Sequence, residues 1–317
     1  MKVGIIGTGN IASKMAQTIS QIEGMECYAI ASRNMESAEV FKKEYEFLKA
    51  YGSYEQMIQD EGVELVYIAT PNSCHFDEAM NCLSHNKPVL VEKAFTVNAK
   101  QAEKLVEASK VNDVLLTEGM WTRFMPSVKI IKGIICEGTI GEIVSINANM
   151  GNNVKHMQRI VDPELAGGAL LDVGIYALTF SCMFLGTEIE MVHSLCKQYQ
   201  TGVDAANVIC LKYKKGQLAT LHSSIINTTD RSGVIYGTKG YIVADNINNI
   251  KTLKIYNAKN VLIKNMSVPK QISGYEYELI AVKNALEKGY KECEEMTRAE
   301  SVEMMRIMDQ VREQWND

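Results

Sequence analysis

The sequence predicts an α/β domain followed by an α+β domain with a large, mostly antiparallel open sheet. Over residues 1 to about 120, short apolar runs alternate with segments whose apolar residues recur at helical spacing. Beyond that point, β-rich segments with turn signals between them become frequent. A chain of 317 residues is long enough for about two domains. We place the domains at residues 1–121 and 122–317, joined by a short connection near Trp121.

Five apolar runs predict buried strands in the first domain. They cover residues 2–6, 25–31, 65–69, 88–91 and 114–116. After the first run, Ile11, Met15 and Ile19 recur on one face of a predicted helix, and similar patterns follow the later runs. Strand–helix alternation of this kind implies right-handed crossovers. It therefore predicts a mainly parallel sheet with helices on both faces.

The second domain begins with two predicted helices, at residues 127–137 and about 169–185. Two strand-like runs, at 208–213 and 217–226, flank Lys214-Lys215-Gly216 and predict a hairpin. Further strands are expected at 233–237, 241–244 and 252–256, and two closing helices at about 279–286 and 302–311. We expect an α+β domain around a largely antiparallel sheet.

Composition narrows the class of partner. Hydrophobic residues make up 46% and charged residues 22%, which is typical of a globular protein. The net charge of −5 gives no electrostatic reason to expect nucleic acid or an anionic membrane surface. The most membrane-like stretch, residues 168–186, is interrupted by Asp172, so we expect a buried helix there. The eight cysteines form no CxxC pair and no metal-ligand spacing, so we expect a cytoplasmic protein without a metal site.

The first strand ends in Gly7-Thr8-Gly9-Asn10-Ile11-Ala12, which opens a helix. This hexapeptide matches the G-x-G-x-x-G/A fingerprint of dinucleotide-binding folds. The first glycine permits the tight turn, the second lets a pyrophosphate approach the backbone, and Ala12 allows close packing of helix on strand. The alternative is a merely structural glycine turn.

The end of the second strand bears on the choice of nucleotide. An NAD site commonly carries Asp or Glu there to bind the ribose 2′-hydroxyl. This strand ends in Ser32 and Arg33, with no carboxylate. Ser32 can donate to a 2′-phosphate and Arg33 can pair with it. The sequence therefore favours NADP, with NAD as the alternative. The alternative interpretation of Arg33 is an exposed cation in a loop without a role in binding.

A third polar segment follows the strand at 65–69. Thr70-Pro71-Asn72 and His75 stand where open parallel sheets bind their ligands, outside the carboxyl ends of the strands. We therefore include them among the candidate cofactor-binding residues. Taken alone, the segment also fits an ordinary turn.

Together with these segments, Val91-Glu92-Lys93-Ala94 and the run from Gly167 to Tyr176 complete a recognisable pattern. The chain resembles the glucose–fructose oxidoreductase / inositol dehydrogenase / rhizopine-catabolism (Gfo/Idh/MocA) family over nearly its whole length. Trp121-Thr122-Arg123-Phe124 and Tyr176 make it most similar to the dihydrodiol dehydrogenase branch.

The resemblance implies a Rossmann dinucleotide-binding domain and a second domain whose open sheet forms a homodimer or homotetramer. It also implies that Lys93 lies at the nicotinamide and the substrate, with Glu92 positioning the cofactor or the lysine. Ala94 stands where most of the family has proline, so the backbone constraint of proline is not implied here. Relatives in the dihydrodiol branch share this departure.

Asp172 and Tyr176 are four residues apart and project from one face of the predicted helix. A carboxylate in such an apolar helix is costly unless something pairs with it. One interpretation is a buried Asp that satisfies backbone groups. The other is that Asp172 orients the substrate or Lys93 and that Tyr176 reaches the substrate hydroxyl.

Oxidation of an alcohol needs a hydride acceptor and a proton acceptor, and the protein supplies the second. A nearby ammonium favours the phenolate and lowers a tyrosine pKa. Either Lys93 or Tyr176 can carry the proton, and we favour Tyr176. Trp121 and Arg123 are candidate substrate-binding residues at the domain junction, although a tryptophan that packs the hinge is nearly as good an interpretation. The cations Lys155, His156 and Arg159 are interpreted as surface residues.

The sequence thus predicts an NADP-dependent oxidoreductase acting on a secondary alcohol or ketone of a sugar, polyol or cyclic diol. An alternative from another class is an NADP-binding regulator or redox sensor without chemistry. A third keeps the cofactor permanently bound and cycles two sugars through it.

Overall fold

The computed structural model describes residues 1–315, and these form two compact units. The first unit comprises Met1–Phe124 and Gln271–Val302. The second comprises Met125–Lys270 and the chain from Glu303 onward. Each unit is described by itself below.

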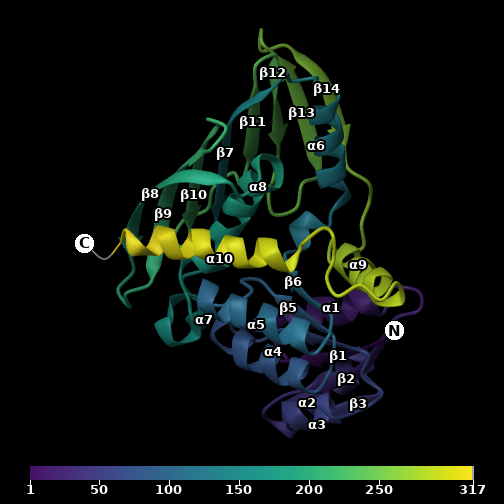
Figure 1. Cartoon of the computed structure of the whole chain (residues 1–317). Helices are drawn as coiled ribbons and strands as arrows, with labels where there is room; N and C mark the ends of the chain where they lie inside the picture. The colour runs from purple at the N-terminus through teal and green to yellow at the C-terminus, as the bar shows by residue number, and fades with distance from the viewer. Residues whose placement is uncertain (316–317) are drawn as a thin grey trace. The chain divides into compact units, whose positions relative to one another are not determined.

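The first unit contains a six-stranded parallel sheet in the order β3-β2-β1-β4-β5-β6 (Figure 1). Its strands are β1 (Lys2–Ile6), β2 (Glu26–Ala31), β3 (Lys49–Tyr51), β4 (Leu65–Ile68), β5 (Val89–Glu92) and β6 (Leu116–Gly119). Its main helices are α1 (Asn10–Ile19), α2 (Met35–Tyr45), α3 (Tyr54–Ile58), α4 (His75–Ser84), α5 (Ala99–Val111) and α9 (Glu276–Glu287). β1, β4 and β5 are almost wholly buried, as expected for strands covered on both faces.

The strand order places a topological switch point between β1 and β4. From β1 the chain moves outward to β2 and β3, then returns to the other side of β1 for β4, β5 and β6. In doubly wound sheets, ligands bind outside the carboxyl ends of the strands at such a point. The loops that follow β1, β4 and β5 are therefore the ones that matter for a site.

The second unit contains an eight-stranded sheet in the order β14-β13-β12-β11-β7-β10-β9-β8. Its strands are β7 (Ile143–Gly151), β8 (Ile189–Gln198), β9 (Asp204–Tyr213), β10 (Leu218–Ser224), β11 (Gly233–Gly237), β12 (Gly240–Ala244), β13 (Thr252–Asn257) and β14 (Leu262–Ser267). All neighbours pair antiparallel except β7 and β10, which are parallel. Helix α8 (Ile175–Leu185) packs on β7 and β10 (Figure 1). The other helices are α6 (Pro126–Cys136), the short α7 (Gln158–Val161), and most of α10 (Arg298–Glu313), which begins in the first unit.

The predicted fold class is confirmed, with differences in detail. The strand expected at 114–116 is β6, at Leu116–Gly119. β3, β7, β8 and β14 were not predicted. β7 was missed because polar residues alternate along it, among them Asn147 and Asn149, and this weakens its apolar signal. Its position in the middle of the sheet makes the sheet mixed rather than purely antiparallel.

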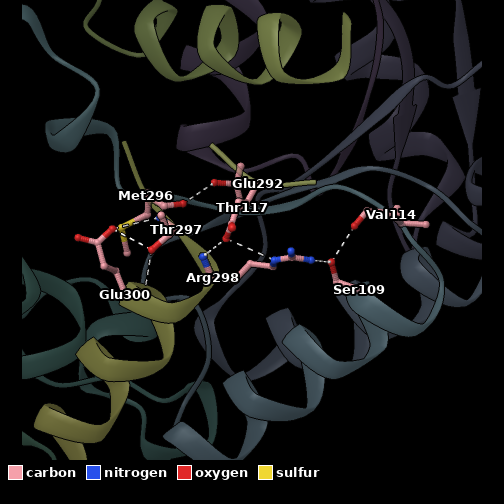
Figure 2. Close-up of polar contacts among 8 residues, drawn as sticks. All are labelled: Ser109, Val114, Thr117, Glu292, Met296, Thr297, Arg298 and Glu300. Carbon is pink, nitrogen blue, oxygen red and sulfur yellow. Dashed lines mark hydrogen bonds and ion pairs between the residues drawn. The ribbon is translucent and has the colours of Figure 1, made fainter. Parts of the chain in front are cut away.

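The predicted division into residues 1–121 and 122–317 differs from the observed units. The first unit extends to Phe124, and Gln271–Val302 returns to it. Hydrogen bonds explain this return (Figure 2). The Thr117 hydroxyl of β6 donates to the Met296 carbonyl (3.2 Å), and the Arg298 guanidinium donates to Ser109 Oγ at the end of α5 (2.9 Å). A prediction from local pattern cannot detect contacts between residues so distant in the chain.

One helical stretch, Pro163–Leu185, is long and apolar enough to cross a membrane, with a mean hydropathy of 1.7. Within that stretch, 83% of the most apolar window is buried inside the protein. This is the character of the core helix that the sequence predicted there.

Candidate active site

The turn after β1 has the geometry of a phosphate-binding turn. Gly7 has a φ of +101°, and a Cβ atom there would lie 2.9 Å from the Ala69 carbonyl oxygen, so only glycine fits. Nothing lies within 4 Å of the Cβ position at Gly9, which leaves open space over the backbone. Gly9 is the N-cap of α1, with no side-chain cap and no acidic residue in the first turn. Uncapped amides at a helix start bind anions, so the turn at Gly7–Ile11 fits a dinucleotide pyrophosphate.

The end of β2 carries a small cluster of polar side chains. Arg33 is exposed and hydrogen-bonds Tyr54, and its charge also acts on Glu78. Burial raises the pKa of Glu78 to about 7, although a hydrogen bond from Thr70 Oγ1 (2.5 Å) favours the ionised form. Ser32 is half-buried at the start of the cluster. Tyr54 and Glu78 were not singled out in the sequence, because neither stands in the fingerprint.

His75 connects two loops at the carboxyl edge of the sheet. Its Nε2 lies 3.0 Å from the Thr70 carbonyl oxygen, and its Nδ1 lies 2.8 Å from the Ala94 carbonyl oxygen. The side chain is fully buried, and burial lowers the pKa of the imidazole. Both ring nitrogens therefore face main-chain carbonyls, and His75 holds the Thr70-Pro71-Asn72 turn beside the loop after β5. Its contact with the cofactor stays a prediction.

The loop after β5 carries Lys93 and is fixed at successive residues by buried side chains. The Lys93 amide donates to Glu92 Oε2 (3.1 Å), His75 meets the Ala94 carbonyl, and the Phe95 amide donates to Glu118 Oε1 (3.1 Å). The peptide bond between Lys93 and Ala94 is cis, although residue 94 is alanine. Lys93 itself is half-buried. The backbone that presents this lysine is therefore held from three sides.

Three further acidic or phenolic groups lie beneath this loop. The buried Tyr67 hydroxyl of β4 donates to Glu92 Oε1. Glu278 of α9 is fully buried, and neither of its carboxyl oxygens has a hydrogen-bond partner among residues 1–315. Burial and the nearby Glu92 charge raise the pKa of Glu278 well above its usual value. Burial likewise raises the pKa of Glu118 to about 7. In the sequence, Glu118 and Glu278 could have been noticed as carboxylates at core positions of otherwise apolar elements.

The two candidate substrate residues near position 121 behave differently. Trp121 is 5% exposed and stacks on Tyr275, with ring centroids 4.4 Å apart and planes inclined by 10°. Arg123 forms an ion pair with Glu300, and its Nε donates to the Glu295 carbonyl (2.8 Å). The buried guanidinium of Arg123 thus fixes the segment before α10, and its contact with substrate stays a prediction.

In the second unit, Asp172 lies in a π-helical turn, η4 (Leu170–Gly174), that leads into α8. The sequence predicted a helix here but not its wider first turn; π-turns are rare and are frequent at functional sites. Arg159 Nη1 donates to Asp172 Oδ1 (3.1 Å), a contact that its interpretation as a surface residue did not include. Tyr176 follows in the first turn of α8 and is 7% exposed. Lys93 belongs to the first unit, and Asp172 and Tyr176 belong to the second.

Comparison with known families agrees with this geometry. Residues 1–120 match the family described as "Oxidoreductase family, NAD-binding Rossmann fold", and residues 128–243 match the "GFO/IDH/MocA C-terminal domain". The chain belongs to the Gfo/Idh/MocA family. The resemblance noted in the sequence is thereby confirmed, and with it the assignment of this family member as an oxidoreductase.

Among related sequences, this Gfo/Idh/MocA protein is similar to trans-1,2-dihydrobenzene-1,2-diol dehydrogenases. The Xenopus laevis protein is 33% identical over 99% of this chain and 97% of its own length. The Homo sapiens protein is 31% identical over 98% of this chain and 96% of its own length.

Solved structures show the same fold. The 3-ketoreductase KijD10 of Actinomadura kijaniata, in complex with NADP and TDP-benzene, matches with a TM-score of 0.92 and 23% identity, over 100% of this chain and 98% of that chain. A levoglucosan dehydrogenase in complex with NADH and levoglucosan matches with a TM-score of 0.89 and 18% identity, over 99% and 96% of the two chains.

Proposed function

We propose that this protein is an NADP-dependent oxidoreductase that transfers a hydride between the nicotinamide and a secondary alcohol or ketone of a sugar, polyol or cyclic diol. The observation that carries the proposal is the arrangement at the switch point of the parallel sheet. There, the open backbone at Gly9 follows β1, and the rigidly held Lys93 loop follows β5. A dinucleotide whose phosphates bind at the Gly9 turn extends toward the Lys93 loop, because ligands of this fold lie across the strand ends.

The preference for NADP is supported by the cluster at the end of β2. Ser32 and Arg33 offer a hydroxyl and a guanidinium, and no carboxylate ends that strand to bind a ribose 2′-hydroxyl. The KijD10 complex contains NADP and the levoglucosan dehydrogenase complex contains NADH, so the fold alone does not choose between them. The choice rests on these side chains.

The nicotinamide supplies hydride transfer when it is bound, and the chain supplies the proton chemistry. Lys93 orients the reacting oxygen and stabilises negative charge on it. Tyr176 acts as the proton donor in reduction and as the proton acceptor in oxidation. Asp172, itself oriented by Arg159, directs the substrate hydroxyl or the lysine. The half-buried Tyr275, stacked on the buried Trp121, offers an aromatic side chain suited to a ring-shaped substrate.

The substrate class follows from the relatives. Curated relatives are named as dehydrogenases of a cyclic diol, and structural neighbours are a ketoreductase and an anhydrosugar dehydrogenase. All of these names describe chemistry at carbon bearing an alcohol or a ketone. We therefore favour cyclic polyols and their ketones as first substrates.

The test is a screen of sugars, cyclic diols and 2-ketoaldehydes by nicotinamide absorbance at 340 nm, with NADP(H) and NAD(H) in parallel. We expect turnover with at least one member of the class. Lys93→Met should lower kcat by about a hundredfold or more with nucleotide affinity nearly unchanged. Tight NADPH binding without turnover of any candidate would favour the regulator or sensor. NADPH that co-purifies and is never released would favour the two-sugar cycle.

We also propose that a second copy of this chain covers the outer face of the eight-stranded sheet. Leu195 of β8 is 79% exposed and pairs in register with the exposed Val208 of β9. Toward the other edge, the half-buried rings of Tyr236, Tyr241 and Tyr256 form a row across β11, β12 and β13, in which Tyr241 stacks on Tyr256. Exposed apolar and aromatic side chains gathered on one face are typical of an interface.

A further inference from the structure

A chain of buried polar side chains lies beneath the π-turn that carries Asp172. The Leu170 amide, at the start of the turn, donates to Asp204 Oδ2 (2.8 Å). The Asn207 side-chain amide donates to the same oxygen (2.8 Å), and the Ser223 hydroxyl donates to Asn207 Oδ1 (2.8 Å). Asp204 and Asn207 belong to β9 and Ser223 to β10, so the sheet itself fixes the position of the carboxylate.

These hydrogen-bonded side chains explain why glycine stands at two positions of the turn. A Cβ at Gly168, whose φ is +115°, would lie 2.2 Å from Asp204 Oδ1. A Cβ at Gly174 would lie 2.9 Å from Ser223 Oγ. Both distances are too short for a side chain, so the glycines admit the polar groups to the backbone of the turn. The Gly168–Tyr176 motif and these residues of β9 and β10 therefore pack together as one unit.

The surroundings of Asp204 shift its pKa in two opposing ways. Its side chain is half-buried, and this desolvation raises its pKa to about 6. Hydrogen bonds from Asn207 and Leu170 favour the ionised form, as does the charge of Arg312 on α10. The other titratable group that interacts with it is the Cys196 thiol of β8, whose pKa the Asp204 charge helps to raise. At neutral pH, the Leu170 amide thus donates to a carboxylate, and such charge-assisted bonds are about twice as strong as neutral ones.

We propose that Asp204 is a positioning residue for the oxidoreductase reaction. Its carboxylate, oriented by Asn207 and Ser223, holds the Leu170 amide and so fixes the π-turn from which Asp172 and Tyr176 project. Without that acceptor, the turn is free to rewind as an ordinary α-helix, which changes the direction of Asp172 relative to Tyr176. This inference rests on the proposed function, since it assigns a role toward the residues of that reaction.

The experiment compares Asp204→Ala with Asp204→Asn in the full chain. The asparagine oxygen can accept from both Leu170 and Asn207, whereas alanine accepts from neither. We expect Asp204→Ala to lower kcat by about tenfold to a hundredfold, with NADPH affinity within about twofold of wild type. Asp204→Asn should recover kcat to within about threefold, and it should lack the fall in kcat that we expect of wild type below about pH 6. Asp230→Asn should behave as wild type, because it removes a carboxylate in the loop between β10 and β11, away from the turn, that accepts from Asn149 (2.7 Å).

A second measurement keeps the test independent of folding and of activity. Ser223→Ala removes only the far end of the polar chain, and amide hydrogen exchange over residues 170–176 reports the turn directly. We expect faster exchange there in Asp204→Ala and Ser223→Ala, and wild-type exchange in Asp204→Asn. The proposal is overturned if Asp204→Ala leaves exchange and kcat unchanged, or if Asp204→Asn is no better than alanine. If the wild type turns over no substrate, the proposed function fails, whereas the exchange data still decide on the positioning role.

Discussion

Glu278 and Glu92 are neighbouring carboxyl groups with opposite surroundings. Glu92 accepts hydrogen bonds from the Tyr67 hydroxyl and the Lys93 amide, whereas Glu278 has no hydrogen-bond partner among the described residues. Two carboxylates in one buried site cannot both ionise cheaply, so the proton resides on the group without donors. The pair therefore carries a single negative charge, placed on Glu92 beside the Lys93 loop.

This assignment predicts how stability depends on pH. The pKa of Glu278 is higher in the folded protein than in the unfolded chain. Below about pH 4.5 the carboxyl is protonated in both states, and ionisation of Glu278 costs the folded state nothing. As the pH rises toward the folded-state pKa, the unfolded chain ionises more readily than the folded protein, so the free energy of unfolding falls. Glu278→Gln cannot ionise, so we expect its Tm relative to wild type to increase with pH between 5 and 9, as measured by calorimetry. Glu287→Gln, at the exposed end of the same helix, should show a constant offset. A constant offset for Glu278→Gln as well would contradict the assignment.

The turn after β1 predicts a separation of stability from binding. Gly7→Ala places a Cβ 2.9 Å from the Ala69 carbonyl at a φ of +101°, and should destabilise the protein by about 1–3 kcal/mol. Gly9→Ala meets nothing within 4 Å and has a φ of −86°, so it should cost no more than about 0.5 kcal/mol. It should nevertheless weaken NADPH binding about tenfold or more, because the methyl group occupies the space that the pyrophosphate approaches. Thermal unfolding and fluorescence titration of both variants check this. Equal nucleotide affinity in Gly9→Ala and wild type would place the phosphates elsewhere.

The sequence predicted five of the six strands of the parallel sheet because an apolar run marks each of them; β3, only Lys49–Tyr51, carries no such run and was missed. It failed at Gln271–Val302, whose membership in the first unit depends on contacts such as Thr117 with Met296 and Arg298 with Ser109. These partners are far apart in the chain, and no local periodicity encodes them. β7 failed for a different reason, since its alternating polar residues conceal a central strand.

The candidate site divides in the same way. Residues in contiguous motifs, such as Gly9, Lys93 and Asp172, could be selected from the sequence. The residues that hold them could not, because Glu118 and Asp204 reach the motifs only through the fold. His75 and Arg123 were selected for residue types that suit ligand contact, and the fold adds a role that the types do not reveal, since both buried side chains bond main-chain carbonyls.

The outer face of the eight-stranded sheet predicts a dimer that one charge can disrupt. Leu195→Glu places a carboxylate in the centre of the exposed apolar pair with Val208, and burial of an unpaired charge at an interface is costly. We expect the wild type to be dimeric at micromolar concentration in light scattering, and the variant to be largely monomeric with an unchanged fold by circular dichroism. Val111→Glu, at an equally exposed aliphatic residue of α5, is the matched control and should remain dimeric. A monomeric wild type would remove the interface from this face.

The cluster of Arg33, Tyr54 and Glu78 predicts that the proposed preference for NADP over NAD depends on pH. The pKa of Glu78 is about 7, so the carboxyl is largely protonated below this value and ionised above it. The ionised form competes for Arg33 and repels a 2′-phosphate. Glu78→Gln should therefore tighten NADPH binding at pH 8 by about threefold to tenfold, and much less at pH 6.

The comparison of variant with wild type at the same pH cancels the ionisation of the 2′-phosphate itself. NADH lacks that phosphate, so its affinity should be nearly unchanged in Glu78→Gln at either pH. Arg33→Ala should weaken NADPH binding by about tenfold to a hundredfold and leave NADH nearly unaffected, because it removes a charge-assisted contact to the phosphate alone. Fluorescence titrations with both nucleotides at pH 6 and pH 8 measure all of these affinities. If Arg33→Ala weakens NADPH and NADH equally, the side chain contacts a part of the nucleotide common to both, and the preference for NADP has another origin.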